Sequence, residues 1–112
     1  MKLAIAIASK NAEPSAFVVW RGFSSSIEKA KTAGYQGVEL ALRSEKEYRE
    51  EGIAGILKKT GMEVSCISTG QVFATDRLCF THEDADIRKR TIETFKGLIN
   101  VAGGLGAMVN IG

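Results

Sequence analysis

Cysteine and histidine are both scarce in this sequence, and their scarcity excludes two kinds of protein. Cys66 and Cys79 are the two cysteines, with neither a CxxC spacing nor a second pair, so they do not make the disulfide framework of a small secreted protein. His82 is the single histidine, and one histidine is no metal-binding motif. We therefore expect two reduced thiols in a cytoplasmic protein.

A strong charge of either sign and a long apolar run are also absent. The 15 basic and 13 acidic residues are spread along the chain and leave a formal net charge of +2, whereas a nucleic-acid-binding protein needs a basic face. No stretch approaches the about 20 apolar residues of a membrane span. The N-terminal MKLAIAIASK has fewer apolar residues than the roughly 7–15 of a secretory signal. We expect neither nucleic acid nor a membrane as a partner.

What the sequence does contain is a regular alternation of strand-like and helix-like segments, without a linker or a low-complexity stretch. Its 112 residues, 45% apolar and 25% charged, are typical of one globular domain. The patterns predict strands over 3–9, 37–42, 63–68 and 107–111, and helices from Ser25 to Gly34, over about 46–60 and over about 84–105. Three strand–helix units followed by a fourth strand make an α/β protein.

Capping signals mark the ends of these predicted helices. Ser25 and Glu28 have the S-x-x-E spacing of a capping box, which begins a helix. Glycines at 34, 61 and 106 follow the three helical patterns, and glycine ends helices readily because it adopts the left-handed conformation. We expect the third helix to bury Ile87, Thr91, Phe95, Leu98, Ala102 and Leu105, with Ile92 and Ile99 beside this stripe.

Two long segments between the predicted elements indicate where a site lies. Strands that alternate with helices are parallel, either in a small open sheet with helices on both faces or in part of an eight-fold β/α barrel. In both architectures ligands bind beyond the carboxyl ends of the strands. Residues 10–23 and 69–83 leave two of those ends. We expect both segments to be loops without regular structure, and 70–83 to be the most mobile part of the chain.

Three passages of the sequence together resemble a known family. AGYQGVEL, GMEVSCISTG and DADIRKRTIETFKGLINVAGGLGAMVNIG are similar, in this order and spacing, to the N-terminal half of the xylose isomerase-like TIM barrels. This family contains sugar and sugar-phosphate isomerases and epimerases and is distantly similar to endonuclease IV. A complete (β/α)8 barrel needs about 250 residues. The resemblance therefore implies that 1–112 is a partial domain, completed by a second half or by a partner chain.

The resemblance also implies an activity and a cofactor for the intact protein. Enzymes of the family move a proton beside a sugar carbonyl, using one divalent metal (Mn, Mg, Co or Zn) held by two Glu, an Asp and a His from the second half. None of those positions exists in this chain, so it carries no catalytic residue and no metal ligand by resemblance. We expect a cytoplasmic fragment that is inactive alone and whose partner molecule is a sugar or sugar phosphate.

Five residues near the predicted strand tips are candidates for substrate binding. Glu39 lies within the second strand, facing away from Val38 and Leu40; the alternative is a structural carboxylate satisfied by a lysine or by backbone amides. Ser68, Thr69, Gly70 and Gln71 follow the third strand and suit a polyol, although they also suit an ordinary tight exit from a strand.

Three further candidates lie in the segments around the strand tips. Arg43 follows the second strand and suits a phosphate or a carboxylate. His82 lies in FTHED, where it would touch phosphate or metal, or else simply begin the next helix. Trp20, like Phe17 and Phe23, would stack on a sugar ring or form the loop's own small core.

A rival function remains open at this point. The chain would then be a non-catalytic α/β half-barrel module that binds a small ligand. In a half barrel the first and fourth strands are edges, and both are apolar here, in LAIAIA and AMVNI. Exposed apolar edges pair with other chains. For either function we therefore expect a homo-oligomer formed through these edges, unless a missing C-terminal half covers them.

Overall fold

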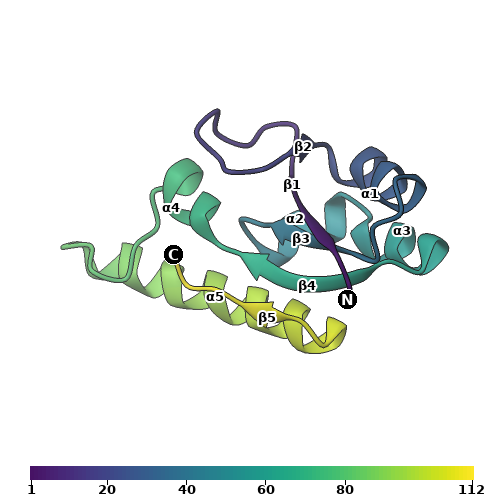
Figure 1. Ribbon diagram of the computed structural model, residues 1–112. Helices are drawn as coiled ribbons and strands as arrows, with labels where there is room; N and C mark the ends of the chain where they lie inside the picture. The colour runs from purple at the N-terminus through teal and green to yellow at the C-terminus, as the bar shows by residue number, and fades with distance from the viewer.

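The computed structural model describes residues 1–112 and confirms an α/β fold built on an open, all-parallel sheet of five strands (Figure 1). The strands are β1 (Ala4–Ala8), β2 (Trp20–Arg21), β3 (Gly37–Ala41), β4 (Glu63–Ser68) and β5 (Met108–Val109). The helices are α1 (Phe23–Thr32), α2 (Glu45–Glu50), α3 (Ile53–Thr60), α4 (Gly70–Asp76) and α5 (Ala85–Leu105). The strand order is β2-β1-β3-β4-β5.

The helices share one hydrophobic core with one face of the sheet. Ile5 and Ile7 of β1 pair with Val38 and Leu40 of β3, and all four side chains belong to a core that also includes residues of α1, α3 and α5. The opposite face carries mainly small and polar side chains, among them Ala4, Ala6, Glu39, Cys66 and Ser68. Because the strand residues of the core all lie on one face, the fold is compatible with half a β/α barrel and not with a doubly wound sheet.

The longest helix, α5, agrees with its sequence pattern. Asp84 caps its start by accepting a 2.8 Å hydrogen bond from the backbone N–H of Asp86, and Gly106 ends it with a φ of 64°. The buried side chains are Thr91, Phe95, Leu98, Val101 and Ala102. Ile92 and Ile99 instead lie on the solvent side of α5, exposed by 44% and 52%. No helix of the chain is both long and apolar enough to span a membrane.

The start of the first predicted helix was wrong, and so was the prediction of the second as one continuous helix. Helix α1 begins at Phe23 after Gly22, whose φ of 91° turns the chain out of β2, and Ser25 donates to the Gly22 carbonyl instead of capping the helix. The predicted helix over 46–60 is two helices, α2 and α3. Gly52, with a φ of 64°, lies between them because this left-handed conformation interrupts a helix.

The first predicted loop contains a strand, so the prediction of β1 as a sheet edge was wrong. Trp20 pairs with Ile7 in parallel, and the N–H of Val19 donates to the Ala6 carbonyl at 3.0 Å. The loop over 10–19 therefore returns to cover the outer edge of β1 over its second half. The two edges of the sheet are β2 and β5, each two residues long.

The second predicted loop, over 69–83, also has regular structure. It begins with helix α4, in which Gln71 and Val72 are buried, and Leu78 is buried just after it. The N–H of Leu78 donates to the Val72 carbonyl at 3.3 Å. Sequence periodicity missed this helix because it has only seven residues. Only two side chains of this segment, Val72 in the helix and Leu78 after it, pack into the hydrophobic core, which is too few to show a helical period.

Candidate functional site

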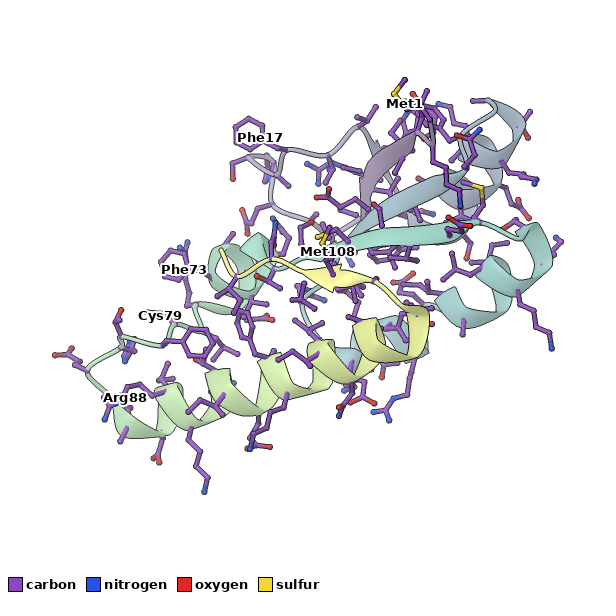
Figure 2. The ribbon with its side chains drawn as sticks, turned by 60° about the horizontal axis from the view of Figure 1, so that its bottom comes forward. Met1, Phe17, Phe73, Cys79, Arg88 and Met108 are labelled. Carbon is purple, nitrogen blue, oxygen red and sulfur yellow. The ribbon has the colours of Figure 1, made fainter.

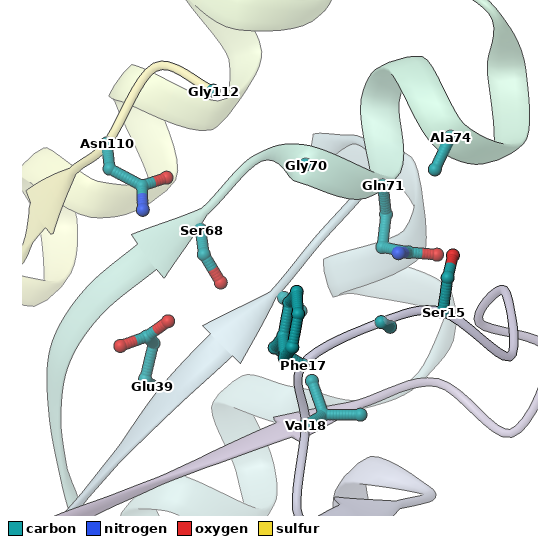
Figure 3. Close-up of a pocket in the computed structure, with 12 residues that line it drawn as sticks. Ser15, Phe17, Val18, Glu39, Ser68, Gly70, Gln71, Ala74, Asn110 and Gly112 are labelled. Atoms are coloured by element: carbon teal, nitrogen blue, oxygen red, sulfur yellow. The ribbon is translucent and has the colours of Figure 1, made fainter.

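A pocket of about 360 Å³ lies at the carboxyl ends of β3 and β4, between β5 and the loop over 10–19 (Figure 3). Its position matches the expected place of a site in a parallel α/β sheet. Its lining residues are Ser15, Ala16, Phe17, Val18, Glu39, Ala41, Ser68, Gly70, Gln71, Ala74, Asn110 and Gly112. Four of the eight candidate residues, Glu39, Ser68, Gly70 and Gln71, are thus brought together here.

Glu39 is the one ionisable side chain in the lining of the pocket. It is half-buried and projects from β3 on the face opposite the core (Figure 3). The chain forms seven ion pairs, and Glu39 takes part in none of them. Its side-chain carboxylate also accepts no hydrogen bond within the chain. The structure therefore does not support the alternative of a carboxylate satisfied by a lysine or by backbone amides.

Cys66 lies beside Glu39, because the two residues are paired in the register of β3 and β4. Partial burial is the main cause that raises the pKa of the Cys66 thiol, and the negative charge of Glu39 raises it further. A hydrogen bond with the backbone of Asn110 acts in the opposite direction. A raised pKa keeps the thiol protonated at neutral pH, so Cys66 is a poor nucleophile. It is not among the residues that line the pocket.

Three other polar side chains of the pocket have hydrogen-bonding groups to spare. The Gln71 Oε1 atom accepts from the N–H of Glu13 and the hydroxyl of Thr75, both at 3.0 Å, and its amide nitrogen is left without a partner in the chain. The Asn110 Oδ1 atom accepts from the Thr69 N–H at 3.1 Å, again leaving the amide nitrogen free. The Ser68 hydroxyl makes no hydrogen bond, so donors and acceptors face one space.

Thr69 does not line the pocket, although it was a candidate. Its side chain is fully buried, its hydroxyl donates to the Asn110 carbonyl at 2.9 Å, and it accepts from the Gly112 N–H at 3.2 Å. These bonds fasten residues 110–112 against the end of β4. Thr69 thereby positions Asn110 at the pocket without touching it.

Arg43 is likewise placed outside the pocket. Its Nε atom lies 3.1 Å from Glu47 Oε1, its backbone N–H donates to Glu47 Oε2 at 2.8 Å, and its Nη1 atom lies 3.8 Å from Asp76. Glu47, the nearer of its two acidic partners, is buried. Arg43 therefore ties α2 to α4, and it is not free to bind a phosphate in this pocket.

His82 adopts the simpler of its two predicted roles. Its Nδ1 atom accepts a 3.0 Å hydrogen bond from the N–H of Asp84, and its carbonyl accepts from the Arg88 guanidinium. These contacts shape the turn that begins α5. His82 is not among the lining residues of the pocket.

The aromatic residue at the pocket is Phe17, and not Trp20. Trp20 packs edge-on against Tyr35, with ring centroids 6.2 Å apart, and Lys29 Nζ lies 4.3 Å from the centre of the indole. Phe23 is buried in the core. Phe17 is fully exposed and projects from the loop over 10–19 (Figure 2). It is also one of the lining residues of the pocket (Figure 3).

Ser15 and Asn110 are pocket residues that sequence reasoning missed. Asn110 had a usable signal, because it is the one polar side chain in the apolar segment AMVNI and stands at a strand tip. Ser15 had none, since its place depends on how the loop over 10–19 folds back over the sheet.

The chain offers no donor set for the divalent metal that the resemblance implies. No group of three or more His, Cys, Asp or Glu side chains lies where it could hold a metal ion. A single carboxylate, that of Glu39, faces the pocket. We therefore assign no metal-dependent step to residues of this chain.

Comparison of the chain with known proteins does not assign it to a family. Neither a protein-family model nor a curated protein matches the chain.

Proposed function

We propose that this chain is the N-terminal half of a xylose isomerase-like sugar or sugar-phosphate isomerase or epimerase, and that it supplies substrate-binding groups rather than catalysts. One observation carries this proposal: the free polar groups of Glu39, Ser68, Gln71 and Asn110 converge on one pocket at the tips of parallel strands. A pocket of about 360 Å³ is within the usual range for small-molecule sites.

These four side chains have the chemistry that a polyol needs. The Glu39 carboxylate accepts hydrogen bonds from sugar hydroxyls, and bonds to a charged acceptor are stronger than neutral ones. The free amide nitrogens of Gln71 and Asn110 donate to sugar oxygens, while the Ser68 hydroxyl can do either. Their role is to hold the sugar in one orientation. The proton transfer and the divalent metal belong to residues outside this chain.

A second candidate function rests on the open edge of the sheet. The outer edge of β5 has no partner strand, and Met108 and Ile111 beside it are exposed by 72% and 68%. Such an edge favours a self-associating, non-catalytic half-barrel module that binds a small ligand in the same pocket. Under both functions we place the protein in the cytoplasm, since Cys66 and Cys79 are free thiols.

Binding of monosaccharides to the chain tests the site that both functions share. In a titration with D-xylose, D-glucose and D-fructose followed by ¹⁵N NMR, we expect shifts at the amides of Ser68, Gln71 and Asn110. Asn110→Ala should weaken binding roughly fivefold, because it removes one hydrogen-bond donor. Asn100→Ala, an exposed change on α5, is the matched control. If no pocket amide shifts at high sugar concentration, the proposed site is wrong.

Activity measurements then separate the two functions. The chain alone should interconvert no aldose and ketose, with or without Mn²⁺, Mg²⁺, Co²⁺ or Zn²⁺, because it has no group of metal-ligating side chains. Calorimetry should detect no specific divalent site. A micromolar affinity for Mn²⁺ or Zn²⁺ that is lost in His82→Ala would contradict this expectation. Isomerase activity in a longer polypeptide containing this chain would favour the enzyme over the module.

A further inference from the structure

We infer that the pocket takes a polyhydroxyl ligand without a phosphate or carboxylate group, which means an unphosphorylated sugar. This inference rests on the proposed function and narrows its substrate class. It follows from the charges that surround the pocket. Among the side chains of the twelve lining residues there is one carboxylate, that of Glu39, and no lysine, arginine or histidine.

Two arginines at the carboxyl end of the sheet, Arg21 and Arg43, are already engaged elsewhere. The Arg21 guanidinium donates to the carbonyls of Ala12 at 2.6 Å and Glu13 at 3.0 Å, and so holds the loop over 10–19 in place. Arg43 is bound to Glu47 and lies near Asp76. Releasing either arginine to a ligand would break contacts that shape the site.

The backbone at the start of α4 does not replace the missing cation. Helix α4 has seven residues, so its dipole is small. Gly112 packs against this helix start, where a Cβ atom added to Gly112 would lie 3.8 Å from the Gly70 nitrogen. The Thr69 N–H, just before the helix, is taken by Asn110. The Thr69 amide is therefore not free to bind an anion, and so short a helix adds little positive potential at the pocket.

An anionic ligand would meet an uncompensated negative charge in this pocket. Glu39 has no ion-pair partner, so its field is opposed only by solvent, and two like charges within a pocket repel each other measurably even at an effective dielectric constant of about 20. A neutral polyol meets no such cost and satisfies the free groups of Glu39, Gln71 and Asn110. Phe17 at the mouth offers an apolar ring face to the sugar, a contact that needs no charge.

Matched sugars with and without phosphate test this inference on the whole chain. We would titrate D-fructose against D-fructose 6-phosphate, and D-xylulose against D-xylulose 5-phosphate, at low salt by ¹⁵N NMR. The expected result is that each phosphorylated sugar binds roughly tenfold more weakly than its neutral partner. In Glu39→Gln the preference should fall to within about threefold, since the repelling charge is gone. A dispersed spectrum shows that the variant is folded.

The outcomes distinguish failure of the preference for neutral sugars from failure of the proposed sugar site. Glu63→Gln, at the amino end of β4 and paired with Lys2, is the control and should keep the preference. If the phosphorylated sugars bind equally well or better, or if Glu39→Gln keeps the full preference, the inference is overturned while the sugar site stands. If neither sugar of a pair shifts the pocket amides, the proposed function itself fails.

Discussion

At the scale of single residues, two glutamates show the difference between a functional and a structural carboxylate. Glu47 is buried, and its carboxylate accepts from the backbone and the guanidinium of Arg43. Its backbone N–H donates to the Ser44 hydroxyl, which caps the start of α2. Glu39 is half-buried and has no partner. A site group that is left unsatisfied is available to a ligand at some cost in stability.

The two glutamates should therefore respond in opposite ways to loss of charge. Glu47→Gln is expected to lower the free energy of unfolding by about 1–3 kcal/mol, because it weakens charge-assisted hydrogen bonds to Arg43. Glu39→Gln should leave it unchanged or raise it slightly, since it removes an unpaired carboxylate from a partly buried place. Urea unfolding of both variants measures this. A large loss of stability in Glu39→Gln would mean that the carboxylate is structural after all.

The two cysteines should differ in reactivity for a similar local reason. The Thr81 hydroxyl, which lies 3.2 Å from Cys79 Sγ, is the main cause that lowers the pKa of Cys79, and backbone hydrogen bonds from Thr81 and His82 lower it further. The pKa of Cys66 is raised, mainly by burial. Since the thiolate is the reactive form, Cys79 holds more of it at neutral pH.

Alkylation with iodoacetamide at pH 7, read by mass spectrometry, should thus modify Cys79 faster than Cys66. Thr81→Val should slow Cys79, because its pKa then rises toward the ordinary value. In Cys79→Ser only the slow reaction at Cys66 should remain. Equal rates at both thiols in the folded chain would contradict the expectation.

At the scale of elements, the end of β4 is the point where the short strand β5 is held. Thr69 bonds through its hydroxyl to the Asn110 carbonyl and the Gly112 N–H, and through its own N–H to the Asn110 side chain. Strand β5 itself has only two residues. The buried side chain of Thr69 therefore holds β5 at the edge of the sheet, whereas β3 and β4 are held together by a longer ladder of backbone hydrogen bonds.

Thr69→Val keeps the shape of the side chain and removes its hydroxyl. We expect it to lower the free energy of unfolding by about 1–2 kcal/mol, because the Asn110 carbonyl and the Gly112 N–H lose a partly buried partner. Hydrogen exchange at residues 108–112 should become faster. Thr32→Val, at an exposed position of α1 where the hydroxyl donates to the Glu28 carbonyl, should change stability by less than about 0.5 kcal/mol. Unchanged exchange at 108–112 would show that β5 is held by other contacts.

At the scale of the whole molecule, the two edges of the sheet differ in how far they are covered. β2 and the loop before it cover part of the edge of β1. The outer edge of β5 is open, and Met108 projects from it on the side away from α5 (Figure 2). Ile92 and Ile99 are exposed along α5, which packs against β5. Four of the ten exposed large apolar side chains, Ile92, Ile99, Met108 and Ile111, therefore lie at this end of the sheet.

We expect the chain to self-associate through this end at tens of micromolar, where light scattering should detect a dimer. Met108→Lys should shift the equilibrium toward monomer, since a charge on an edge strand opposes pairing with another chain. Thr32→Lys on exposed α1 is the control and should leave the dimer intact. A monodisperse monomer at these concentrations, unfolding sharply and cooperatively, would refute the expectation.

The sequence by itself determined those features that depend on neighbours in the chain. The alternation of the longer strands β1, β3 and β4 with helices followed from the periods of the apolar residues, and the end of α5 followed from Gly106. The place of a site followed from the parallel strands, whose carboxyl ends lie together. Glu39 could be chosen because alternation along β3 turns it away from Val38 and Leu40.

Only the tertiary structure decided which side chains meet at the pocket. Thr69 and Asn110 are 41 residues apart in sequence, and Glu13 and Gln71 are 58 apart. No local pattern specifies such pairs, because they arise when the loop over 10–19 and the segment after α5 fold back onto the strand tips. The same long-range packing decided the places of two aromatic residues. Trp20 lies in β2, where its backbone pairs with Ile7 of β1. Phe17 lies in the loop before β2 and lines the pocket.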